Sequence, residues 1–126
     1  TALFNLRYST ELTDEIIVKK VESILSKHQL DFDIKWTYNG KPFITEPGVL
    51  LDNVIVAIEK ITCDKPVLST SGGTSDGRFI APTGAEVIEL GPCNATIHQI
   101  NECVSCDDLI KLADIYYHTM VGVLCP

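Results

Sequence analysis

The loop that follows the apolar stretch 85–90 holds two side chains suited to binding or catalysis, Asn94 and His98, four positions apart. A neutral imidazole is the commonest protein ligand for zinc, and a carboxamide can bind a polar substrate. A zinc site needs three or four ligands, whereas the two other histidines, His28 and His118, fall in expected helices with packing or solvent-facing roles. On local sequence alone, a purely structural role for His98 stays open.

A glycine-rich stretch, residues 72–79, is the second place where chemistry is expected. Its glycines allow backbone N–H groups to approach a ligand closely, Thr74 offers a hydroxyl, and Arg78 could meet a carboxylate. The stretch lacks the lysine and the spacing of a nucleotide-binding P-loop. A plain strand-to-helix turn capped by Ser75 and Asp76 is the alternative.

Other polar groups have weaker claims. Glu102 could orient the ring of His98, or it is simply an acidic residue before a helix. Cys103 and Cys106 have the spacing of a redox dithiol or of half a zinc knuckle, without a second pair. Arg7 could clamp a carboxylate with two hydrogen bonds, although a cross-strand ion pair is the ordinary explanation.

Strands and helices must position these groups. Alternating or continuous apolar residues predict strands over 3–8, 31–38, 67–68 and 85–90. Helical spacing predicts a helix that Thr13 caps and that runs to about Gln29, and a second helix beyond Pro47. These elements predict an α/β protein, in which a strand-helix-strand unit of α+β type precedes a layered α/β part.

The last predicted helix begins near Ser105, and Ser105 and Asp108 are its expected capping residues. Its expected apolar face consists of Leu109, Leu112, Ala113, Tyr116 and Met120. The break at 45–48 predicts a boundary between two partial domains, residues 1–45 and 46–126.

Composition excludes several classes of function. The 126 residues carry a net charge of −7, with ten basic residues scattered among seventeen acidic ones, so a nucleic-acid partner is not expected. No apolar run approaches the roughly 20 residues of a membrane-spanning helix, and the five cysteines have no repeated spacing. We therefore expect a cytoplasmic protein without membrane contact or structural disulfides. Because the chain opens on Thr1 rather than methionine, we expect a fragment.

Taken in order, the motifs resemble the succinyl-diaminopimelate desuccinylases, di-zinc amidohydrolases within a wider group of metallopeptidases and aminoacylases. The resemblance covers essentially the whole chain. It rests on FNLRYST at 4–10, NGKPF at 39–43, GGTSDGRF at 72–79, and ELGP at 89–92 leading to NATIH at 94–98 and to Asn101-Glu102.

This resemblance implies roles for individual residues. His98 matches a zinc ligand, in an enzyme that binds two zinc ions per subunit and in which cobalt can replace zinc. The positions that hold the carboxylates and the amide of the substrate match Arg7, Asn39, Gly73, Thr74 and Asn94. Residues 1–45 match the later part of a lid and dimerisation domain, and residues 46–126 match the C-terminal part of the zinc-binding catalytic domain.

The family converts N-succinyl-L,L-diaminopimelate and water to succinate and L,L-diaminopimelate, for lysine and peptidoglycan precursors, as a homodimer. The remaining metal ligands and the glutamate general base of the family have no match in this chain, so no catalytic residue is assigned here and the isolated chain is expected to be inactive. Alternatives are a related N-acyl amino acid deacylase or dipeptidase, a non-catalytic substrate-binding module, and a thiol redox domain.

Overall fold

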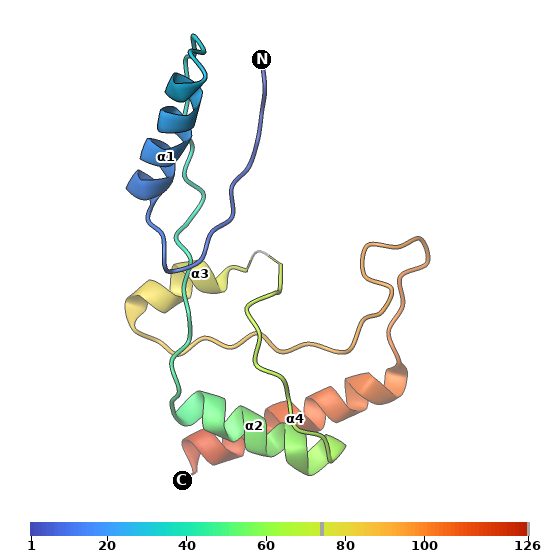
Figure 1. Ribbon diagram of the computed structural model, residues 1–126. Helices are drawn as coiled ribbons and strands as arrows, with labels where there is room; N and C mark the ends of the chain where they lie inside the picture. The colour runs from blue at the N-terminus through green and yellow to red at the C-terminus, as the bar shows by residue number, and fades with distance from the viewer. Residues whose placement is uncertain (74, 126) are drawn as a thin grey trace. The chain divides into compact units, whose positions relative to one another are not determined.

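The structure is a computed structural model that describes residues 1–73 and 75–125. The chain forms two compact units, Thr1–Ile44 and Thr45–Pro126 (Figure 1). The assignment of residues 1–45 to a lid domain and of 46–126 to a catalytic domain stays a prediction.

Helix α1, Asp14–Lys27, is the regular element of the first unit. It begins where the sequence predicts, because the hydroxyl of Thr13 accepts a hydrogen bond from the backbone N–H of Ile16 at 3.4 Å. The pKa of Glu15 lies below its ordinary value. The larger cause is a hydrogen bond from the side chain of Thr13, and the second cause is a hydrogen bond from the backbone N–H of Glu15 itself. The first turn of α1 thus has a side-chain cap, and the acidic side chains of Asp14 and Glu15 complement its dipole.

The two chain segments that flank α1 approach each other through aromatic side chains. The rings of Phe4 and Trp36 meet edge to face, with centroids 6.5 Å apart and planes at 90°. The strands predicted over 3–8 and 31–38 therefore lie near each other, as a strand-helix-strand unit requires. Neither segment is a β-strand in the structure.

The α/β prediction is not confirmed, because residues 1–73 and 75–125 contain helices and no strand, at 67–68 and 85–90 included. A strand exists only when a neighbouring strand pairs with its backbone, and alternation of apolar residues reports a face rather than a partner. Some side chains of the predicted strands are correspondingly open, with Leu3 100% exposed and Val67 89% exposed, whereas Ile34, Trp36 and Val87 are half-buried.

Helices α2, Val49–Thr62, and α4, Cys106–Leu124, pack side by side in the second unit (Figure 1). The core between them consists of Val54, Ala57, Ile115 and Thr119, which are 7%, 2%, 5% and 6% exposed. Ser105 caps α4 as predicted, its Oγ accepting from the backbone N–H of Asp108 at 3.4 Å. This pair is the best-packed part of the described chain. No helix formed by residues 1–73 and 75–125 has the length and apolarity needed to span a membrane.

The apolar face predicted for α4 is wrong in detail. Leu109, Tyr116 and Met120 are 45%, 44% and 55% exposed, whereas Ile115 and Thr119 face α2. The helix carries apolar residues on more than one face, so its periodicity does not identify the face that packs.

The segment 85–90 attaches to the helices through side chains. The Thr45 hydroxyl donates to the carbonyl of Val87, and the Tyr116 hydroxyl donates to the carbonyl of Leu90 at 2.5 Å. The side-chain oxygen Oε2 of Glu86 accepts from the backbone N–H of Leu50 at 2.8 Å. Glu86 therefore caps α2, whose N-cap residue, Gly48, has no side chain to do so.

Replacing Glu86 with alanine is expected to lower the free energy of unfolding by about 1 kcal/mol, the usual cost of a lost helix cap. Glu86→Gln keeps an acceptor oxygen and serves as the matched control. Gly48→Ala should also destabilise the protein, because the new Cβ would lie 2.5 Å from Glu86 Oε1 and would displace the carboxylate from the backbone N–H of Leu50. Urea unfolding midpoints measure all three, and an alanine variant as stable as the glutamine variant would contradict the cap.

Candidate functional site

The glycine-rich loop leads into a short helix, α3, Gly77–Ile80, and a 3-10 turn, η1, Ala81–Thr83. Ser75 Oγ accepts from the backbone N–H of Gly77 at 2.8 Å, whereas Asp76 at the N-cap position makes no side-chain cap. One of the two expected caps is thus present. A Cβ built at Gly73 meets no atom within 4 Å, so the backbone there is open to a ligand. Thr74 lies outside the described residues.

Arg78 does not extend toward an acid within the described residues. Its guanidinium lies 4.7 Å from the centroid of the Phe79 ring, in a cation–π arrangement. Its Nε is buried and makes no hydrogen bond to any described residue. The side chain therefore packs locally at the start of α3.

Hydrogen bonds organise the loop that carries the second motif. The Asn94 carboxamide accepts from the Thr96 backbone N–H at 3.0 Å and donates from Nδ2 to Glu102 Oε1 at 2.7 Å. The backbone N–H of Cys103 donates to the Thr96 hydroxyl at 3.0 Å, and the Cys103 carbonyl also lies 3.0 Å from that hydroxyl. Side chains thus close the loop at its base.

His98 lies within this closed loop, exposed and with a backbone φ of 62°. That left-handed conformation is uncommon for residues other than glycine and costs free energy that surrounding contacts must offset. Across the described residues, no group of three or more His, Cys, Asp or Glu side chains gathers to hold a metal ion. His98 can thus supply one ligand, and the described residues do not by themselves fit a zinc centre.

Glu102 pairs with Asn94, and no hydrogen bond joins it to His98 in the part of the chain that the structure describes. Of the two alternatives for Glu102, orientation of the His98 ring is not seen within the described residues, and its carboxylate binds Asn94 instead. Sequence reasoning missed this pairing, since the two residues are eight positions apart in an irregular loop. All five cysteines, Cys103 and Cys106 among them, are exposed free thiols.

Arg7 and Asn39, the substrate-binding candidates of the first unit, are both exposed. Neither makes a side-chain hydrogen bond or ion pair within residues 1–73 and 75–125, so the cross-strand ion pair considered for Arg7 does not form there. A guanidinium and a carboxamide that face solvent remain free to bind an anion. The structure brings Asn94 and His98 into one loop; Gly73 belongs to a different loop of the same unit.

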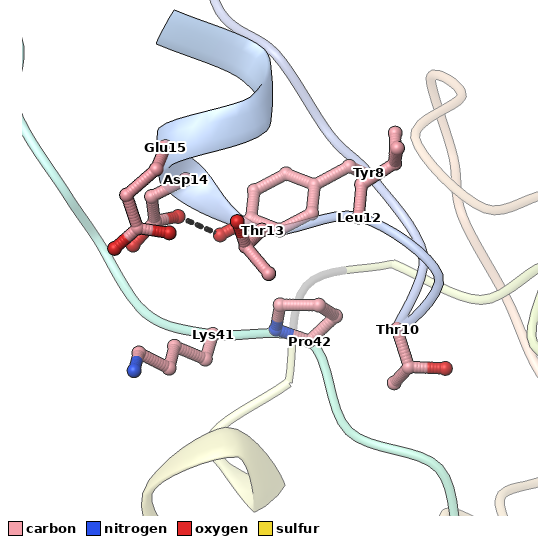
Figure 2. Close-up of a pocket in the computed structure, with 8 residues that line it drawn as sticks. All are labelled: Tyr8, Thr10, Leu12, Thr13, Asp14, Glu15, Lys41 and Pro42. Atoms are coloured by element: carbon pink, nitrogen blue, oxygen red, sulfur yellow. Dashed lines mark hydrogen bonds between the residues drawn. The ribbon is translucent and has the colours of Figure 1, made fainter.

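A pocket of about 200 Å³ in the first unit lies next to these positions in sequence. Figure 2 shows its lining, which includes Tyr8, Asp14, Glu15 and Lys41. The Tyr8 hydroxyl donates a hydrogen bond to Asp14 Oδ1 across it. Arg7 and Asn39 do not line this pocket.

Tyr8 is expected to ionise later than an ordinary tyrosine. The hydrogen bond to Asp14, then burial, then the charge of Asp14, raise its pKa from 10.0 to about 12. Because the folded-state pKa is the higher one, this stabilisation is complete below pH 10 and is lost as the pH rises through about 12. Spectroscopic titration of the four tyrosines should show one late component that Tyr8→Phe removes and Asp14→Asn shifts down. A wild-type curve in which all four ionise together would contradict the pair.

Comparison with known proteins covers both units. The model of the peptidase family M20/M25/M40 matches residues 6–121. A succinyl-diaminopimelate desuccinylase of Colwellia psychrerythraea is 73% identical over 128 residues, which cover 98% of this chain and 32% of that protein. Succinyl-diaminopimelate desuccinylase 2 of Alteromonas mediterranea is 62% identical over 121 residues, with 96% of this chain and 32% of that protein covered.

The chain thus spans about a third of the length of these curated relatives. The family model extends over both compact units and includes the Arg7 segment, the glycine-rich loop and the loop of Asn94 and His98. On this match, the chain belongs to the peptidase family M20/M25/M40.

Proposed function

We propose that the chain is part of a zinc-dependent amidohydrolase that converts N-succinyl-L,L-diaminopimelate and water to succinate and L,L-diaminopimelate. The observation that carries this proposal is the 73% identity to a succinyl-diaminopimelate desuccinylase over 98% of the chain. The free guanidinium of Arg7 and the carboxamide of Asn94 support it, because the substrate is strongly anionic.

The residues of this chain bind and orient the substrate. Arg7 and Asn39, with Gly73, Thr74 and Asn94, hold the carboxylates and the amide carbonyl through guanidinium, carboxamide, hydroxyl and backbone N–H donors. His98 is one zinc ligand, and the other ligands and the general base come from outside these 126 residues. Zinc, when bound, polarises an amide carbonyl and lowers the pKa of water.

Two properties of the whole enzyme belong to the proposal. It works in the cytoplasm, and it forms a homodimer through the unit that contains α1. Ile16 and Ile24 on α1 are 47% and 49% exposed, which supports pairing of this helix with another surface. The isolated 126 residues are inactive and retain little zinc, since one ligand cannot hold a zinc pair.

The test is release of succinate by the full-length protein loaded with zinc. A panel of N-acyl amino acids and dipeptides, assayed in parallel, separates the proposed activity from that of a related deacylase or dipeptidase. Preference for the succinylated substrate supports the proposal, and faster turnover of another acyl group replaces the substrate assignment. Inactivity toward the whole panel would favour a non-catalytic binding module.

A further inference from the structure

The two ends of the Asn94 carboxamide are fixed by partners that cannot exchange roles. Oδ1 faces the Thr96 backbone N–H at 3.0 Å, and Nδ2 faces Glu102 Oε1 at 2.7 Å. A backbone N–H can only donate, and an ionised carboxylate can only accept. The orientation of this amide, which is often ambiguous for asparagine, is therefore set by its surroundings.

This arrangement leaves one kind of group available to a ligand. The Thr96 hydroxyl also lies 3.1 Å from Asn94 Oδ1, so that oxygen is engaged on the loop side. The carboxamide nitrogen has two hydrogens, and Glu102 takes one of them. Asn94, which is half-buried, can thus offer its second N–H to a ligand, and the group that it recognises must be a hydrogen-bond acceptor.

We propose that Glu102 is a positioning residue, which holds Asn94 as an N–H donor toward a carboxylate or amide oxygen of the substrate. This inference rests on the proposed function and adds to it a residue that does not itself contact the substrate. Because Glu102 contributes a carboxylate, its bond to Asn94 is a charge-assisted hydrogen bond. Such bonds are roughly twice as strong as neutral ones. Glu102 is exposed, so solvent screens the repulsion between its negative charge and an anionic substrate.

Thr96 completes the arrangement. Its hydroxyl bridges Asn94 and Cys103, at 3.1 Å from the Asn94 Oδ1 and 3.0 Å from the Cys103 nitrogen. Thr96, which together with Glu102 fixes the Asn94 carboxamide, thus also closes the loop around His98. Glu102 and Thr96 together link the position of a substrate-binding group to that of the metal-ligand candidate.

The experiment uses the full-length zinc-loaded protein and compares Glu102→Ala with Glu102→Gln. Alanine removes the acceptor, so KM for the succinylated substrate should rise about tenfold while kcat changes less than about threefold, the pattern of lost uniform binding. Glutamine can present an amide oxygen to Asn94 Nδ2 and should restore KM to within about threefold of wild type. Glu59→Ala, an exposed glutamate on α2 without a side-chain hydrogen bond in the described residues, is the control.

A second variant tests the donor role directly. Asn94→Asp keeps the size of the side chain and replaces the donor with an acceptor, so KM for the succinylated substrate should rise more than about tenfold. An unchanged KM in Glu102→Ala, a glutamine variant as impaired as alanine, or an unchanged KM in Asn94→Asp each overturns the inference. Lack of succinate release by the wild type instead overturns the proposed function, and the variants are then compared on the acyl substrate that the panel identifies.

Discussion

Replacing His98 with alanine in the full-length protein should lower succinate release by more than about a hundredfold and lower the bound zinc. The reason is that loss of a group that merely supports a metal ligand already costs about ten- to a hundredfold, and loss of the ligand itself costs at least as much. Metal analysis of the purified protein and a succinate assay measure the two effects separately.

The matched control for this variant is His28→Ala. His28 is an exposed histidine at the C-terminal end of α1, and no side-chain hydrogen bond holds it within residues 1–73 and 75–125. The His28→Ala variant should retain both its bound zinc and its activity. If the His98 variant kept its full zinc content and turnover, the ligand role of His98 would be wrong.

The second large effect is expected at Arg7. An arginine that binds a carboxylate through charged hydrogen bonds contributes about 1.5–3 kcal/mol, which corresponds to roughly ten- to a hundredfold in affinity. Arg7→Ala should therefore raise KM by about that factor. Arg7→Lys should recover part of the loss, because lysine restores the charge without the two-pronged geometry.

Lys35→Ala is the control for Arg7, since Lys35 is an exposed cation of the same unit. Initial rates over a range of substrate concentrations separate KM from kcat for all three variants. Equal KM values for Arg7→Ala and Lys35→Ala would mean that Arg7 acts only through net charge, and a wild-type KM in Arg7→Ala would remove it from the binding site.

Helices α1 and α4 were predictable because the signals for their first residues are local. Thr13 and Ser105 lie next to the helices they cap, and each forms its cap through a backbone N–H three residues further on. The absence of β-strands in the described residues was not predictable. Whether residues 3–8 and 85–90 form strands depends on pairing partners that the pattern within one segment cannot reveal. The curated relatives are about three times as long as this chain, so most of their sequence has no counterpart here.

The candidate site was likewise predictable only in part. Asn94 and His98 could be selected by residue type and by resemblance, and both lie in the predicted loop. The hydrogen-bond partner of Asn94 could not be identified from the sequence, because the bond to Glu102 depends on how an irregular loop folds back on itself. The pairing of Tyr8 with Asp14 escaped notice for the same reason, since a capping residue and a turn separate them.

The carboxylate that caps α2 has a consequence for the order of folding. Glu86 is 36 positions beyond Leu50, the residue whose N–H it accepts. The first turn of α2 therefore cannot be completed until the intervening chain, including the glycine-rich loop, has returned to it, and closing a loop of that length carries an entropic cost. Because this cap joins residues far apart in the sequence, we expect the N-terminal end of α2 to become ordered later than its body, whose hydrogen bonds are local.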